Sequence, residues 1–178
     1  MTLQKGRVLG KFALSACVVA LLSVAATNVE AKVKIVATLA DLGAIASQVG
    51  GPHVEVVTLV PADQDAHYVD ARPSLMLPLS RADLVIANGL QLEAGWLPPL
   101  LRNCRNGKVQ AGTNGYLDAS FFVQRLQVPT QRVSRAMGDV HPGGNPHFTH
   151  DPRAAIRIGA GIAQRLTLLD PVHAADYK

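Results

Sequence analysis

The chain has 178 residues, of which 48% are hydrophobic, 17% charged and 4% aromatic, and its formal net charge is +4. This composition excludes a disordered polyelectrolyte and a repetitive fibre, and it predicts a folded protein. Without residues 1–31 the formal charge falls to +2, because three basic residues and one acidic residue are lost. The remaining chain holds no Lys/Arg cluster that could neutralise phosphate groups, so we expect no nucleic-acid partner.

Residues 1–31 have the layout of a secretory signal peptide, in which basic residues precede an apolar run and small residues follow it. The apolar run is shorter than the roughly 20 residues that a membrane-spanning helix needs. We therefore expect export to the periplasm and removal of residues 1–31, which leaves 147 residues for one domain. Cys17 ends a lipobox-like sequence, but the apolar run continues beyond it, which argues against lipoprotein anchoring there. Cys104 then remains as a free thiol.

Strand and helix patterns alternate in the next part of the chain. Runs typical of strands are 32–38, 54–60, 84–87 and 108–111. Helical patterns fall at 41–49, 72–82 and 93–102, the last of them broken by two prolines at 98–99. This alternation predicts an α/β fold with an open, mainly four-stranded parallel sheet and helices on both faces.

Ligands of open parallel sheets bind beyond the carboxyl ends of the strands. Here these ends are followed by the loops after Val60, Ala87 and Ala111. Residues 113–150 show little periodicity and are expected to be mostly loop. A long amphipathic helix is predicted over 151–169, with Asp151 as its N-cap.

Most of the six histidines lie in predicted loops or at loop edges: His53, His67, His141, His147 and His150, with His173 near the end of the sequence. Neutral imidazole is the commonest metal ligand among side chains, although a single loop histidine proves little. Two positions stand out. His67 lies in the loop after the second predicted strand, and His147 lies just before the long helix, where a rigid corner would limit its freedom.

Three ordered motifs surround these two histidines. The first is Asp65-Ala66-His67 followed by Pro-Ser at 73–74, the second is A-D-L-V-I-A-N-G at 82–89 followed by Glu and Trp-Leu, and the third is N-P-H-F-T-H-D-P at 145–152. Together they resemble the periplasmic solute-binding proteins of bacterial ABC importers for zinc and manganese. The resemblance covers about residues 33–178, and the joint occurrence of the motifs is far more specific than any one of them.

The resemblance implies two α/β lobes that are joined by one long helix and hold the metal between them. Residues 32–150 would be the N-terminal metal-binding lobe, and 151–178 would be the start of the inter-lobe connecting helix. His67 and His147 would be the two ligands of this lobe. In the family the remaining ligands, commonly a third histidine or a glutamate and an aspartate, come from the second lobe. We expect that lobe to be absent here, because the sequence is a fragment or because the lobe has been lost.

Some residues depart from the family pattern or add to it. Ala66 stands where a proline is usual, and Thr149 where a tryptophan is usual, which is expected to loosen packing without removing a ligand. His141 and His150 are extra and could form a transient capture site for the metal. For both of them the favoured interpretation is a solvated loop histidine.

Acidic and aromatic residues near the motifs have simpler interpretations. Glu93 and Trp96 are expected to cap and pack the third strand-to-helix connection rather than to touch metal. One of the three carboxylates around His67 could orient its second ring nitrogen. Solvated loop carboxylates are an equally good interpretation of all three: Asp63, Asp65 and Asp70.

The resulting hypothesis is a monomeric binding protein, not an enzyme, that captures a divalent metal ion and delivers it to an ABC permease in the inner membrane. Two histidines with no carboxylate forced into the shell favour Zn²⁺ over Mn²⁺, which prefers more oxygen. A zinc hydrolase is the main rival, but H-E-x-x-H and a general base are missing from the sequence. An adhesin-like interaction protein is a third interpretation. With two ligands only, the chain should bind metal weakly.

Overall fold

The computed structural model describes residues 31–134 and 137–177, and residues 32–178 form one compact unit. The predicted signal peptide up to residue 30, with the lipobox-like Cys17, lies outside the described residues. None of the helices in the described ranges combines the length and the apolar character needed to cross a bilayer.

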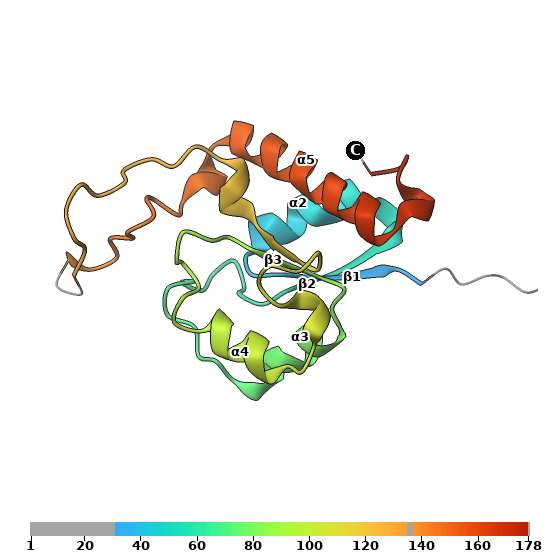
Figure 1. The fold of residues 1–178 in the computed structure, drawn as a ribbon, viewed down its shortest axis with the longest axis horizontal. Helices are drawn as coiled ribbons and strands as arrows, with labels where there is room; N and C mark the ends of the chain where they lie inside the picture. Colours follow the sequence, from blue (N-terminus) through green and yellow to red (C-terminus); the bar gives the residue numbers. More distant parts are fainter. Residues whose placement is uncertain (1–30, 135–136, 178) are drawn as a thin grey trace, which may run out of the picture. The chain divides into compact units, whose positions relative to one another are not determined.

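The sheet has four parallel strands in the order β2-β1-β3-β4 (Figure 1). These are β1 (Val33–Ala37), β2 (Val54–Thr58), β3 (Leu84–Ala87) and β4 (Tyr116–Asp118). The register pairs Ile35 of β1 with Val56 of β2 and with Leu84 of β3, so β1 and β3 are the central strands. The predicted open parallel sheet is confirmed.

Helices cover both faces of the sheet, as predicted. They are α2 (Ala40–Gly50), α3 (Met76–Arg81), α4 (Leu97–Asn103) and α5 (Pro152–Leu169). Figure 1 shows α2 and α5 on one side of the strands and α3 and α4 on the other. Short 3₁₀ turns complete the unit: Gly51–His53, Pro73–Leu75, Gly107–Val109, Ala119–Phe122, Phe148–His150 and Pro171–His173.

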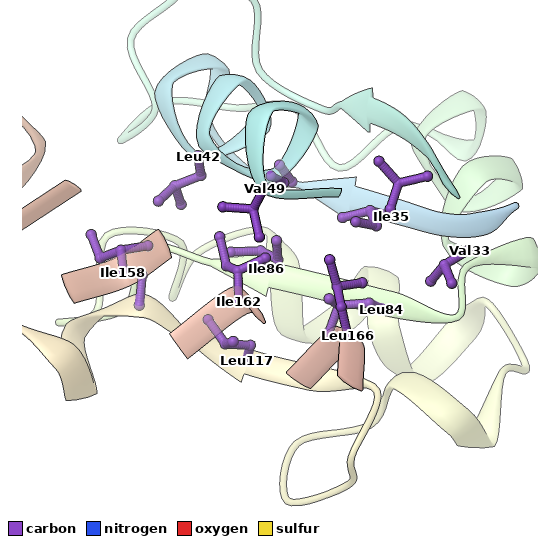
Figure 2. Close-up of a cluster of buried hydrophobic side chains, with 14 of the residues drawn as sticks. Val33, Ile35, Leu42, Val49, Leu84, Ile86, Leu117, Ile158, Ile162 and Leu166 are labelled. Carbon is purple, nitrogen blue, oxygen red and sulfur yellow. The ribbon is translucent and has the colours of Figure 1, made fainter. Parts of the chain in front are cut away.

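Each face has its own apolar core because side chains of a strand point alternately to opposite sides. Ile35, Leu84 and Ile86 meet α2 and α5 on one face (Figure 2). Val36 and Val85, one residue along, join α3 and α4 on the other. Near-continuous burial of β3 is what a central strand of a covered parallel sheet requires.

The long helix forms where the sequence predicts it. The Asp151 carboxylate accepts a hydrogen bond from the Arg153 backbone N–H at 2.9 Å, and Pro152 occupies the first turn. Ile158, Ile162 and Leu166 are completely buried in the first core (Figure 2), so this amphipathic helix closes one face of the sheet.

Two local predictions are wrong. Residues 108–111 do not form the fourth strand, because Gly107–Val109 is a 3₁₀ turn capped by the Asn106 side chain. The fourth strand is β4, within the stretch expected to be mostly loop, and the loop that follows the sheet there begins after Asp118 rather than after Ala111. Pro98 and Pro99 do not break a helix either. They lie in the first turn of α4, where proline costs no hydrogen bond.

Candidate metal centre

The two predicted ligand loops lie beside one cavity beyond the carboxyl end of β2. This cavity has a volume of about 280 Å³, and its lining includes Asp65, His67, His147 and His150. The loop of residues 61–72 contributes the first pair, and the segment before α5 contributes the second. The structure therefore places a cavity where the α/β topology predicts a binding site.

His67 and His147 come together although 80 residues separate them in the sequence. Their ring centroids are 5.5 Å apart. The ring of His141 lies 5.2 Å from that of His67, and the Nε2 atoms of these two histidines are 3.1 Å apart. Three imidazoles from two loops thus form one histidine cluster, defined here as His67, His141 and His147.

His67 is fixed by the carboxylate two residues before it. Asp65 Oδ1 accepts a hydrogen bond from the His67 backbone N–H at 2.9 Å and lies 2.7 Å from ring Nδ1. A proton on Nδ1 satisfies Asp65, which leaves the Nε2 lone pair to accept from Nε2–H of His141. The hydrogen bond from the His67 backbone N–H, together with that from its ring, lowers the pKa of Asp65. Of the three carboxylates considered near His67, Asp65 is the one that orients it.

His147 lies in a turn of the same type. The Asn145 side-chain oxygen accepts a hydrogen bond from the His147 backbone N–H at 2.8 Å, while the Asn145 amide nitrogen donates to Gln127 Oε1 at 2.7 Å. The residue two positions before each histidine therefore forms an Asx turn that presents the imidazole. The side chain of His147 is exposed, so its ring can approach an incoming ion.

His141 is not a solvated loop histidine. Its side chain is half-buried and contacts His67, and a second link between the same loops is the hydrogen bond from Tyr68 Oη to Asp139 at 3.0 Å. Burial lowers the pKa of His141, and the neighbouring imidazoles of His67 and His147 lower it further. A lowered pKa favours the neutral imidazole, which is the form that binds metal.

The remaining candidates are not members of the histidine cluster. His150 is exposed, as expected, although it lines the same cavity as His67 and His147. Cys104 is buried, and its thiol donates to the Leu101 carbonyl, so it is a free structural cysteine. Glu93 and Trp96 are buried in the connection between β3 and α4. The contributions of Asn145 and Tyr68 were not anticipated, although the N-P-H sequence contains the Asx-turn signal for Asn145.

No set of three or more His, Cys, Asp or Glu side chains within 31–134 and 137–177 is arranged to hold a metal ion as it stands. The cluster offers imidazole nitrogens on two loops at a rim of the sheet. An ion bound there would need the rings to adjust or further ligands to join.

Residues 35–178 match the family described as ZnuA, zinc-uptake complex component A, periplasmic. Among named relatives, the manganese ABC transporter substrate-binding lipoprotein PsaA of Streptococcus pneumoniae is 28% identical over 150 residues, which cover 83% of this chain and 45% of that protein. The PsaA of Streptococcus anginosus is 32% identical over 157 residues with the same coverage. These relatives are named as transporter binding proteins and not as enzymes, and the chain spans about half of their length.

Solved structures of periplasmic metal-binding proteins share the fold. A manganese-bound mutant protein from Candidatus Liberibacter asiaticus gives a TM-score of 0.64 at 25% identity and covers 80% of this chain and 47% of its own. A zinc-bound ZnuA deletion mutant gives a TM-score of 0.67 at 23% identity, with 82% and 50% covered. From the match over residues 35–178, the chain belongs to the ZnuA family.

Proposed function

We propose that this chain supplies the first-lobe half of a divalent-metal site in the solute-binding component of an ABC importer, with His67 and His147 as ligands. One observation carries the proposal: two loops from distant parts of the sequence bring these rings to a centroid separation of 5.5 Å at the carboxyl edge of the sheet. The named relatives are metal ABC transporter binding proteins, which supports metal as the cargo.

The cargo that the donor set favours is Zn²⁺ rather than Mn²⁺. Zinc suits tetrahedral imidazole ligands at about 2.0–2.1 Å. Asp65 is engaged with the His67 ring instead of facing the ion, so the first lobe provides nitrogen ligands. Manganese, the metal named for several relatives, prefers more oxygen.

His141 and His150 are the additional candidates. His141 contacts His67 and would hold the ion during capture, before further ligands close around it. His150 is exposed at the same cavity and would attract the ion without staying bound. The rest of the coordination sphere would come from a second lobe, so we expect the isolated chain to bind zinc weakly.

The domain assignment follows from the same proposal. Residues 1–31 would be the signal peptide, 32–150 the metal-binding lobe and 151–178 the start of the helix that leads to a second lobe. A monomeric binding protein of this kind would act in the periplasm and deliver its ion to a permease in the inner membrane. An anchor at Cys17 is not part of the proposal.

Titration of the purified chain with Zn²⁺ and with Mn²⁺, in competition with a chromophoric chelator, tests this function. His67→Ala and His147→Ala should each weaken zinc binding by at least about tenfold, because a ligand matters at least as much as its supporting residues. His141→Ala should have a smaller effect, and His150→Ala the smallest.

His53→Ala is the matched control. It removes an imidazole at the amino end of β2, whereas the cavity lies beyond the carboxyl end of that strand. His53 pairs with Asp176 at 3.1 Å. Unchanged zinc affinity in both His67→Ala and His147→Ala, or an equal loss in His53→Ala, would reject the ligand assignment. Tighter binding of manganese than of zinc would reject the choice of metal alone.

A further inference from the structure

The connection between β3 and α4, residues 88–96, contacts both histidine loops. Asn88 Nδ2 donates a hydrogen bond to the Pro146 carbonyl at 3.0 Å, and Trp96 Nε1 donates to the Ala66 carbonyl at 2.9 Å. Each accepting carbonyl belongs to the residue directly before a proposed ligand histidine. One segment thus holds the backbone at the base of both imidazoles.

This segment is anchored to the sheet by a buried carboxylate. Glu93 is 4% exposed, and its Oε1 accepts from Asn88 N at 2.7 Å and from Thr38 Oγ1 at 2.6 Å, while its Oε2 accepts from Gly89 N at 3.1 Å. Thr38 directly follows β1. Burying a carboxylate is unfavourable unless donors surround it, so this arrangement fixes the turn at a cost that a purely apolar connection would avoid.

The backbone of the turn is strained. Gly89, Leu90 and Gln91 have φ values of 86°, 50° and 70°, so three successive residues adopt the left-handed conformation and two of them are not glycine. Such conformations persist only where surrounding contacts determine them. Leu90 is buried, and a Cβ on Gly143 would lie 3.1 Å from its side chain, so Leu90 also packs against the loop that carries His141 and His147.

The orientation of the Asn88 side-chain amide is set by the hydrogen bond that its nitrogen donates. Nδ2 faces the Pro146 carbonyl, while Oδ1 is buried and finds no hydrogen-bond partner in the described part of the chain. An unsatisfied buried oxygen does not favour folding. The hydrogen bond to the Pro146 carbonyl is therefore the interaction by which this side chain stabilises the structure.

We infer that residues 88–96 are a positioning element that sets the separation and orientation of His67 and His147, with Trp96 serving the first loop, Asn88 the second and Glu93 both. The inference rests on the proposed metal site for its functional meaning, but its geometry is a property of the metal-free chain. None of these three side chains binds the ion.

Nuclear magnetic resonance of the histidine rings in the metal-free chain tests the positioning. Trp96→Phe keeps an aromatic core residue and removes only the N–H donor, so it should shift the ring signals of His67 and leave those of His147 in place. Asn88→Ala should do the reverse. Variants that shift both rings equally, or neither ring, would overturn the inference. If Trp96→Phe fails to fold, Asn88→Ala decides alone, because it removes an unsatisfied oxygen and should retain the fold.

Zinc titration adds a functional readout. Asn88→Ala and Trp96→Phe should each lower zinc affinity by about 10- to 100-fold, as expected for residues that orient ligands. Leu84→Ala is the control: it removes core packing at the amino end of β3, four residues before Asn88, and should lower thermal stability without changing zinc affinity. If Leu84→Ala lowered zinc affinity as much as Asn88→Ala and Trp96→Phe do, the losses would be due to general destabilisation and the inference would fail. A wild-type chain that binds no zinc would reject the metal site, while the ring signals would still decide the positioning.

Discussion

The loops of His67 and His147 use the same local device with different chemistry. In each loop the side chain two residues before the histidine accepts a hydrogen bond from the histidine backbone N–H, at 2.9 Å from Asp65 and 2.8 Å from Asn145. Asp65 also reaches the ring of its histidine at 2.7 Å, whereas Asn145 donates to Gln127 instead.

This difference separates the roles of the two histidines. The carboxylate fixes both the ring orientation and the tautomer of His67, so the lone pair is on Nε2, where it accepts a hydrogen bond from His141 before the metal arrives. His147 is exposed. Asn145 fixes its backbone N–H, but within the described residues Asn145 makes no hydrogen bond to its ring. We therefore expect His67 to be the preorganised ligand and His147 to be the one that adjusts.

Gly89→Ala should have the largest effect, because it disturbs the turn shared by both loops. A Cβ there would clash with Asp118 Oδ1, and the φ value of 86° is unfavourable for alanine. We expect the free energy of unfolding to fall by about 3 kcal/mol, the sum of backbone strain and overpacking. Urea denaturation measures it.

Gly112→Ala is the matched control for that substitution. Its φ value is 89°, but a Cβ would meet no atom within 4 Å. The loss should be about 1 kcal/mol, from backbone strain alone. Equal losses in the two variants would show that Gly89 is needed only for its φ angle and not for its close approach to Asp118.

Asp65→Ala tests the role of the carboxylate in the loop of His67. It removes the turn-forming acceptor and the orientation of the His67 ring together, so zinc affinity should fall by about 10- to 100-fold. The competition titration measures this, and the ring signals of His67 should show a mixture of tautomers. Wild-type affinity in Asp65→Ala would mean that the Asp65 carboxylate does not orient a ligand.

Asn145→Ala tests the loop of His147 and should lower zinc affinity less than Asp65→Ala does. It removes the backbone acceptor for His147 but no contact to its ring, so zinc affinity should fall less than tenfold. The free energy of unfolding should fall by about 1 kcal/mol for the lost hydrogen bond. If Asn145→Ala weakens zinc binding as much as Asp65→Ala does, the two loops do not differ in the way proposed.

Glu93 anchors the segment that holds both loops. Because its carboxyl group titrates differently in the folded and unfolded chain, we expect the stability of the protein to depend on pH. Burial raises its pKa above the ordinary value of 4.5, although the hydrogen bonds from Thr38, Asn88 and Gly89 act in the opposite direction. An acid whose pKa is raised on folding contributes stability that is fully present below pH 4.5 and is lost as the pH rises through the folded pKa.

Glu93→Gln should lack this slope, because an amide does not titrate. Urea denaturation of the wild type and the variant at successive pH values above 4.5 compares the two. Parallel curves would show that Glu93 has the same pKa in the folded and unfolded chain. A steeper loss in the variant than in the wild type would reverse the predicted sign.

The sequence alone determined the architecture and its two main candidate ligands. The runs at 32–38 and 84–87 predict the strands that became β1 and β3, and the stripe from Ile158 to Leu166, with Asp151 as N-cap, predicts α5. These signals are local, because they depend on periodicity and capping within one element. His67 and His147 were singled out by their loop positions, and their role as ligands is what the resemblance to the family motifs around them implies.

The tertiary structure decided what depends on contacts between distant segments. Residues 108–111 and 116–118 each hold one buried aliphatic side chain, Val109 or Leu117, so apolar pattern does not distinguish them, and β4 forms at the latter because residues 116–118 pair with β3. The sequence favours a solvated loop histidine at position 141, whereas the folded chain places His141 in contact with His67. No spacing in the sequence shows that one buried turn binds the backbone before both histidines, because those hydrogen bonds join residues 30 and 58 positions apart.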